Sequence, residues 1–321
     1  MNEILNYHKE DLPALVTLIN EVDAVDKMDR ATTLEELEHR LSFPSVHPET
    51  DFFLTWDGSR LAGYTSVYVA RGVAHTGSTI RCTLMVHPQY RRQGLEQRLL
   101  EKATQRAGEQ MADIEEGEVS LQCITPDADR DLQALLEGFG MSAARYFVNL
   151  DRSISNGLQQ VQVPAGFRLR TFDPERDLET VWRVNNTAFR DHWAPSDAKL
   201  DDIAHWIEIP YIRPDLWFLA ELEATGEVVG LGLNIIDPNW IALTGRQEGY
   251  VDTLAVIREQ RQRGLGTALL VHSLHALRQA GMEAAHLHAD AANLTGAMRL
   301  YERVGFRVRK TTVAYRKTLR T

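Results

Sequence analysis

The second half of the chain alternates short apolar stretches with amphipathic ones. Residues 167–172 predict a strand, and apolar positions at helical spacing in 178–189 predict a helix. A strand pair follows, with a turn at Thr225–Gly226 between 215–223 and 227–236. The remaining elements are strands at 249–256, 284–289 and 306–319 and helices at 267–279 and 294–304. An antiparallel start and a parallel middle predict an α/β (α+β) fold with a mixed central sheet flanked by helices.

The first half of the chain repeats the motifs of the second. Residues 84–100 resemble residues 254–270, with Gly94 opposite Gly264, 170 positions later. Residues 135–141 resemble residues 300–306, with Gly140 opposite Gly305, 165 positions later. Two ordered matches at nearly one offset indicate a duplicated domain of about 150 residues. We expect domains at 1–152 and 166–321, joined by a polar linker at 153–165.

Composition and charge narrow the class of protein. The 321 residues are 44% hydrophobic and 25% charged, as in a globular chain. The net charge of −10 lies in the first 160 residues, which hold 15 basic and 25 acidic side chains. Such a surface repels phosphate backbones, so we expect no nucleic-acid partner. Because a membrane-length apolar run and a basic, apolar leader are both absent from the sequence, we expect a cytoplasmic protein without a membrane partner.

Cysteine and histidine usage argues against metal chemistry. Cys82 and Cys123 form no paired motif, and we expect both to be reduced and buried. His286, His288 and Asp290 alternate along a predicted strand, which is one arrangement that can bind zinc. This stretch also fits an ordinary strand of the sheet, and we expect no metal.

The sharpest chemical signal is the turn Arg261-Gln262-Arg263-Gly264-Leu265-Gly266-Thr267, between an apolar strand and a helix. Glycines allow backbone N–H groups to converge on a ligand, and the first turn of a helix adds unpaired N–H donors. Together these features predict a site for a phosphate or pyrophosphate. A glycine turn that merely begins a helix is the alternative.

The surroundings of this turn resemble the GNAT superfamily of acyl-CoA-dependent N-acyltransferases. The elements of the pattern stand in order at Leu254-Ala255-Val256, 261–266, Asn293, Ala297, Leu300-Tyr301 and Gly305-Phe306. The match covers most of 167–321. The duplicated layout resembles that of the mycothiol synthases and other tandem members, a likeness of architecture that does not carry over the acceptor.

The resemblance implies an acyl-CoA co-substrate, most simply acetyl-CoA. The turn amides would hold its pyrophosphate, and the strand edge at Leu254–Val256, with Asn293, would bind the pantetheine arm. Tyr301 would protonate or stabilise the departing thiolate. Asn293 at a helix start is also suited to capping, and Tyr301 on an amphipathic helix to core packing.

The first copy departs from this pattern at three positions. Glu96 stands where the second copy has Gly266, Leu136 where it has Tyr301, and Ala128 where it has Asn293. A carboxylate at Glu96 would compete for the turn amides and repel a bound anion. We expect the first domain to be non-catalytic, with retention of another ligand as the alternative.

The resemblance leaves the proton acceptor open. Many relatives carry a Glu six residues before the strand-ending Val, and Tyr250 stands at that position here. Asp252 faces the same side of the strand, and we expect it to deprotonate the amine, directly or through water, or to bind the ammonium. The alternatives are a structural pairing of Asp252 with Arg246, and Glu248 as the base.

The acceptor pocket is the least defined part of the prediction. His192 and Trp193, in the loop after the first helix, are candidate substrate-binding residues, as are Asn234 and Tyr250. We expect acyl transfer to a primary amine of a small molecule by direct attack in a ternary complex. Two alternatives stay open: a non-catalytic module that binds or senses acyl-CoA, and a protein N-terminal or lysine acetyltransferase. The sequence does not indicate the oligomeric state.

Overall fold

The computed structural model divides the chain into two compact units. Unit 1 comprises 1–146 together with 312–321, and unit 2 comprises 147–311. The structure describes residues 3–26, 28, 32–43, 46–70, 77–114, 117–190, 193, 199–209, 211–292 and 296–321. Among these residues, no helix combines the length and apolar character needed to cross a bilayer.

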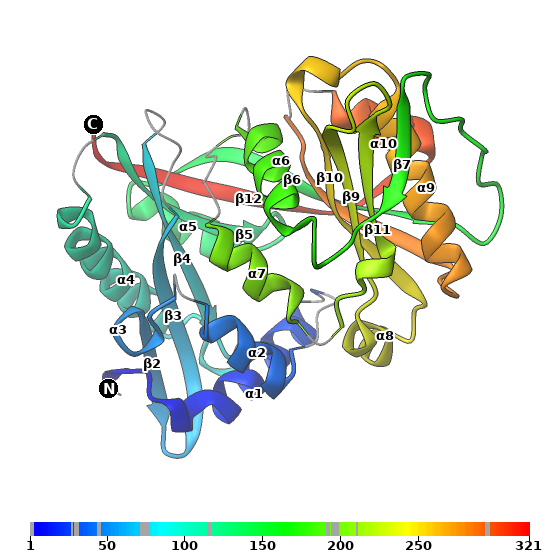
Figure 1. Ribbon diagram of the computed structural model, residues 1–321. Coiled ribbons are helices and arrows are strands. Elements are labelled where there is room, and N and C mark those ends of the chain that lie inside the picture. Colours follow the sequence, from blue (N-terminus) through cyan, green and yellow to red (C-terminus); the bar gives the residue numbers. More distant parts are fainter. Residues whose placement is uncertain are drawn as a thin grey trace. The chain divides into compact units, whose positions relative to one another are not determined.

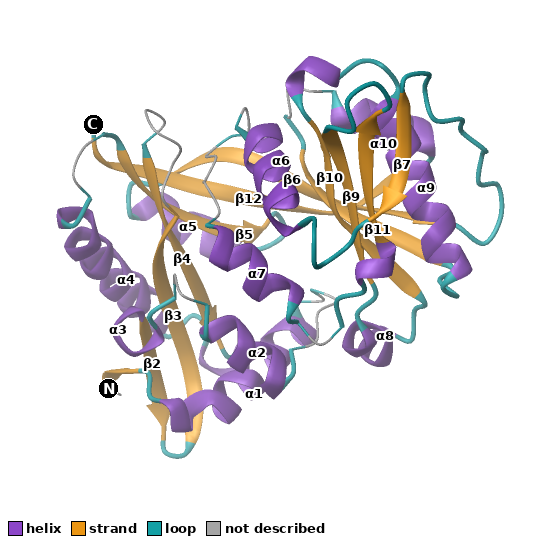
Figure 2. Ribbon diagram, in the orientation of Figure 1, coloured by secondary structure: helices purple, strands orange, loops and turns teal. Residues whose placement is uncertain are grey.

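Unit 1 is a mixed sheet with helices packed on it (Figures 1 and 2). Its strand order is β1-β2-β3-β4-β5-β12. The strands are β1 (Ile4–Asn6), β2 (Phe52–Asp57), β3 (Arg60–Ala70), β4 (Ser78–Val86), β5 (Val119–Pro126) and the end of β12 (Arg307–Arg320). The helices are α1 (Leu12–Val25), α2 (Leu34–Leu41), α3 (Pro48–Asp51), α4 (Leu95–Ala112) and α5 (Arg130–Gly138). Cys82 and Cys123 are free and buried on neighbouring parallel strands, as the sequence predicts.

Unit 2 repeats this architecture, and its strand order is β6-β11-β10-β9-β8-β7. The strands are the end of β6 (Ser142–Ser153), β7 (Phe167–Thr171), β8 (Trp217–Leu222), β9 (Val228–Ile235), β10 (Glu248–Val256) and β11 (Ala284–Asp290). The helices are α6 (Leu178–Phe189), α7 (Leu200–Ile207), α8 (Pro238–Thr244), α9 (Leu265–Gln279) and α10 (Ala297–Val304). In Figure 1, α6 and α9 lie on opposite sides of the strands. The predicted mixed α/β fold is confirmed.

Each sheet is completed by a strand that the other repeat contributes. Phe147–Ser153 of β6 pairs antiparallel with β11 in unit 2. Thr312–Arg320 of β12 pairs antiparallel with β5 in unit 1. The compact units therefore differ from the boundaries expected at 152 and 166. A repeat in the sequence marks the period of the duplication, but it does not specify which sheet receives each closing strand.

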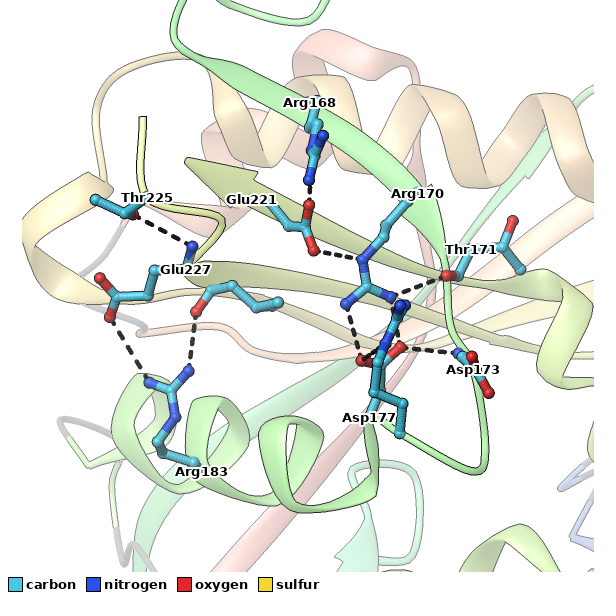
Figure 3. A network of polar contacts seen from close by, with 11 residues as sticks. Arg168, Arg170, Thr171, Asp173, Asp177, Arg183, Glu221, Thr225 and Glu227 are labelled. Atoms are coloured by element: carbon cyan, nitrogen blue, oxygen red, sulfur yellow. Dashed lines mark hydrogen bonds and ion pairs between the residues drawn. The ribbon is translucent and has the colours of Figure 1, made fainter. Parts of the chain in front are cut away.

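A buried ion-pair network fixes α6 against the sheet (Figure 3). Arg170 of β7 donates hydrogen bonds to Glu221 of β8 and to Asp177, the residue before α6. Burial alone raises the pKa of Asp177, but the hydrogen bonds from Arg170 and Arg176 outweigh it and bring the pKa to about 2. Arg183 of α6 also donates to the Val228 carbonyl at 3.3 Å. The start of α6 is therefore held by ion pairs, and its far end, at Ala188 and Phe189, lines the site described next.

Candidate active site

A cavity opens in unit 2 where two parallel strands diverge. β10 and β11 pair only from Glu248 to Tyr250 and from Ala284 to His286, although both strands continue further. The cavity beyond the last pair measures about 530 Å³. Its walls come from β10, β11, the end of α6, the turn 261–267 and α10. The lining includes Asp252, Leu254, Ala255, Val256, His288 and Tyr301.

Asp252 lies in this cavity at an irregularity of the strand. The pairing of β10 with β9 shifts register between Val251 and Thr253, so Asp252 is the extra residue of a β-bulge. The Thr253 hydroxyl donates a hydrogen bond to the Asp252 carboxylate at 2.9 Å. Burial raises the pKa of Asp252 to about 6, and the Thr253 hydrogen bond opposes the rise. A carboxylate of this pKa is ionised at neutral pH and basic enough to accept a proton.

Tyr301 approaches the same cavity from α10. It is 8% exposed and lines the cavity. Burial raises its pKa to about 12, so the phenol stays protonated at neutral pH. Its ring packs edge-on against Phe306 at 6.2 Å between centroids. Tyr301 therefore combines the core packing that its helix position suggests with a place in the cavity wall.

The turn 261–267 has the backbone of a preformed anion site. Gln262 and Gly264 adopt left-handed conformations, with φ of 62° and 82°. Gln262, Gly264, Gly266 and Thr267 line the cavity at the start of α9. The ideal Cβ position at Gly266 lies 3.3 Å from Cδ1 of Leu300, so glycine leaves room for a close approach at this point.

The arginines of the turn hold its shape. Arg261 donates from Nε to the Val256 carbonyl at 3.0 Å and from a terminal nitrogen to the Ala188 carbonyl at 2.7 Å. These bonds tie the turn to the end of β10 and to α6. Arg263 bonds to Gln260 and lies 4.5 Å above the ring of Phe167. Both guanidinium groups are engaged in contacts within the protein, so the groups of the turn that are suited to an anion are its backbone amides.

The equivalent turn of unit 1 has the same backbone but is filled by its own side chain. Arg92 and Gly94 are left-handed at 61° and 80°, and Arg91 donates to the Val86 carbonyl at 3.1 Å. Here, however, the backbone N–H of Arg92 donates to the Glu96 carboxylate at 3.0 Å. Leu136, opposite Tyr301, is fully buried in an apolar core.

Three other described candidates do not line the cavity. Asn234 was expected to bind substrate, yet its side chain is fully buried and donates to the Leu216 carbonyl at 2.7 Å and to Ser273 at 3.0 Å. This corrects that expectation, because the amide belongs to the core. Tyr250 does not line the cavity; its ring stacks on His286 at 4.8 Å, and burial raises its pKa. Trp193 packs against Phe147 at 6.1 Å. His192 and Asn293 lie outside the described residues.

The alternatives for the base are placed elsewhere as well. Arg246 pairs with Glu248 and Asp151 and not with Asp252. Glu248 is 1% exposed in its side chain and is also paired with Arg309 at 3.3 Å, so it is committed to an ion-pair cluster. His288, which sequence reasoning treated only as a metal candidate, lines the cavity and stacks on Phe147 at 5.4 Å.

Three further residues line the cavity, although the sequence did not single them out as binding residues. Phe189 stands at the end of α6, and Arg299 and Arg303 lie on α10. The arginines had a usable signal, since they are spaced four residues apart on a predicted helix beside Tyr301.

The chain resembles a group of bacterial acetyltransferases along its whole length. It is 32% identical over 315 residues to a mycothiol acetyltransferase of Thermobispora bispora, with 96% of each chain covered. A mycothiol acetyltransferase of Saccharomonospora viridis is 33% identical over 236 residues, with 72% of each chain covered.

Solved structures share the fold at lower identity. A GCN5-related N-acetyltransferase from Sphaerobacter thermophilus has a TM-score of 0.78 and 22% identity, covering 100% of this chain and 96% of its own. A tandem GNAT protein from the clavulanic acid pathway has a TM-score of 0.69 and 17% identity, covering 100% and 99%. The sequence profile described as the acetyltransferase (GNAT) family matches twice, at 13–140 and 178–306. The chain therefore belongs to the GNAT family, carries two copies of its domain, and is an N-acetyltransferase.

Proposed function

We propose that unit 2 transfers an acetyl group from acetyl-CoA, or a related acyl-CoA, to a primary amine of a small molecule. The observation that supports this proposal is one cavity bordered by an unfilled amide turn, an open strand edge, a basic carboxylate and a protonated phenol. These are the groups that acyl transfer from a thioester to an ammonium-bearing acceptor requires.

The co-substrate would bind along β10. The amides of 262–267 and the start of α9 supply donors and a positive dipole end for the pyrophosphate. Beyond Tyr250 the edge of β10 that faces β11 has no strand partner among the described residues, so its backbone groups are available to the amides of the pantetheine arm. The resemblance assigns Asn293 to the same arm, and we propose that it bonds the arm as well.

The reaction requires two proton movements. The ammonium of the acceptor gives a proton to Asp252, directly or through one water, and the free amine attacks the thioester carbonyl. The N–C bond forms as the C–S bond breaks, and Tyr301 donates its proton to the departing thiolate. A backbone amide near Ala255 would stabilise the oxyanion. Holding amine and thioester together supplies much of the remaining acceleration.

The acceptor is proposed as a small amine. The most similar relatives reported above are named mycothiol acetyltransferases, which makes their acetyl acceptor the first compound to test. Tyr250 stands where the resemblance predicts a Glu, so the position of the base differs, and the acceptor can differ with it. Unit 1 is proposed to be non-catalytic, because Glu96 occupies its turn and Leu136 replaces the phenol.

Release of CoA thiol from acetyl-CoA, measured across a panel of primary amines, tests the proposal. The panel includes the acceptor of the mycothiol acetyltransferases, amino sugars, polyamines and peptides with free N-termini. Amine-dependent release that Asp252→Asn abolishes would support it. Binding of acetyl-CoA without release for any amine would favour a binding module, and release with peptides alone would favour a protein acetyltransferase.

A further inference from the structure

Two arginines of α10 line the active-site cavity without an acidic partner. Arg299 and Arg303 are four residues apart, so they project from one side of the helix. Both are exposed, and within the described part of the chain neither forms an ion pair. Glu302, between them in sequence, does not line the cavity. The two guanidinium groups thus bring positive charge that no ion pair of the described residues neutralises to the cavity that also contains the turn 261–267.

The positive charge of Arg299 and Arg303 is separate from that of Arg261 in the turn. Arg261, the third arginine of the cavity wall, donates to the backbone carbonyls of Val256 and Ala188 and is occupied in holding the turn. The turn would therefore bind one anionic group through its amides, while Arg299 and Arg303 remain for another. Two cationic side chains one helical turn apart suit a phosphate monoester, which accepts several charge-assisted hydrogen bonds.

The first repeat lacks both arginines. At the 165-residue offset that aligns Gly140 with Gly305, Ala134 stands opposite Arg299 and Gly138 opposite Arg303. The same repeat fills its turn with Glu96. The arginine pair and the open turn are therefore present together in unit 2 and absent together in unit 1, as expected if they serve one polyanionic ligand.

We propose that Arg299 and Arg303 bind the ribose 3′-phosphate of the acyl-CoA and make the enzyme selective for the 3′-phosphorylated carrier. This inference rests on the acyl-CoA-dependent function proposed above. Coenzyme A carries a pyrophosphate and, separately, a phosphate monoester on its ribose. With the pyrophosphate on the turn amides, the monoester is the remaining anionic group of the ligand. No covalent step is involved.

A two-by-two comparison of ligand and protein tests the proposal. Dissociation constants of acetyl-CoA and of acetyl-3′-dephospho-CoA are measured by calorimetry, with the full chain and with the variant that combines Arg299→Ala and Arg303→Ala. Arg307→Ala is the matched control, since this arginine is also exposed but lies on β12 outside the cavity wall. Because all three side chains are exposed, we expect the variants to fold as the parent does, which thermal unfolding checks.

The unaltered chain should bind acetyl-CoA about tenfold or more tightly than the dephospho analogue. That ratio should fall to about one in the double variant and stay unchanged in Arg307→Ala. In turnover, the effect should appear in KM and leave kcat nearly constant, since the 3′-phosphate is remote from the thioester.

Three results would overturn the inference. If the double variant weakens both ligands equally, the arginines act on a different part of the ligand. If it retains the tenfold preference, they do not contact the 3′-phosphate. If the unaltered chain binds neither ligand, the proposed function itself fails, and this inference falls with it.

Discussion

The carboxylate of Glu96 accepts a hydrogen bond from the backbone N–H of Arg92 at 3.0 Å, within a turn whose backbone matches that of 261–264. Both turns have a left-handed second residue and a left-handed glycine, and in both the first arginine bonds the carbonyl that ends the preceding strand. The duplication has kept the shape of the proposed anion site twice, and in unit 1 a side chain accepts a hydrogen bond where we propose that unit 2 binds the anion.

Replacement of the proposed base should remove catalysis without removing the fold. Asp252→Asn should lower kcat/KM by about 10²–10³ at pH 8 and leave acetyl-CoA affinity nearly unchanged. In the parent, kcat/KM should rise with pH through about 6, because Asp252 must be ionised to accept a proton. Steady-state kinetics from pH 5 to 9 measure both effects. If Asp252→Asn keeps its activity and the same rise of kcat/KM with pH, another residue is the base.

The thermal stability of Asp252→Asn shows whether its loss of activity comes from unfolding. The pKa of Asp252 is higher in the folded state than in the unfolded chain. Ionisation of this carboxylate therefore lowers the stability of the fold once the pH exceeds the pKa of the unfolded chain. Asn removes the charge, and the unfolding temperature of Asp252→Asn at pH 8 should be at least that of the parent.

Tyr301→Phe should impair departure of the thiolate while preserving the pocket. The ring keeps its packing against Phe306, and the variant loses only the hydroxyl. We expect kcat to fall about a hundredfold with little change in acetyl-CoA affinity. A thioester whose thiol is more acidic should recover part of the rate, because its departure needs less protonation. An unchanged kcat would show that Tyr301 is not the acid.

The network around Arg170 should make stability depend on pH in the acid range. The pKa of Asp177 is about 2 when folded and about 3.9 when unfolded, so the carboxylate favours the folded state by about 2 kcal/mol above pH 4. This contribution should be lost as the pH falls from 4 to 2. Denaturant unfolding of the parent and of Asp177→Asn should therefore show a difference that is largest at pH 6 and shrinks toward pH 2. A difference independent of pH would contradict the assignment.

Neither repeat should fold alone when the chain is cut at the predicted linker. The fragment 166–321 lacks Phe147–Ser153, so one edge of β11 loses its partner. Residues 312–320 of that fragment lose β5, their partner in unit 1. We expect hydrogen exchange and limited proteolysis to find the fragment poorly protected. The fragment 147–311, which matches unit 2, is the control and should be better protected.

The features that depend on residues close together in the chain could be predicted from the sequence. The turn 261–267 and the helix that carries Tyr301 are recognisable because glycines, arginines and apolar spacing fix backbone conformation within a few residues. The contact of Glu96 with the turn amides could be predicted for the same reason, because this residue is only a few positions from the turn. Asp252 was identified from strand alternation, but the bulge that contains it depends on the register with β9, which the sequence of β10 alone does not reveal.

Features set by long-range pairing were not predictable from the pattern. The exchange of the strands 147–153 and 312–320 depends on partners more than 100 residues away. Asn234 was a candidate substrate-binding residue, yet tertiary packing places its amide between the Leu216 carbonyl and Ser273. The divergence of β10 and β11, which creates the cavity, likewise requires both strands at once.

Calorimetric titration of the full chain with acetyl-CoA tests most directly the claim that only unit 2 binds the co-substrate. We predict one binding site per chain. Gly266→Glu, which copies the glutamate that unit 1 has at position 96, should abolish binding, and Gly266→Ala should retain it. The alanine is a matched control, because its Cβ would meet only side-chain atoms, Cδ1 of Leu300 at 3.3 Å and Cγ2 of Val256 at 3.9 Å. Two sites per chain, or undiminished binding by Gly266→Glu, would contradict this account.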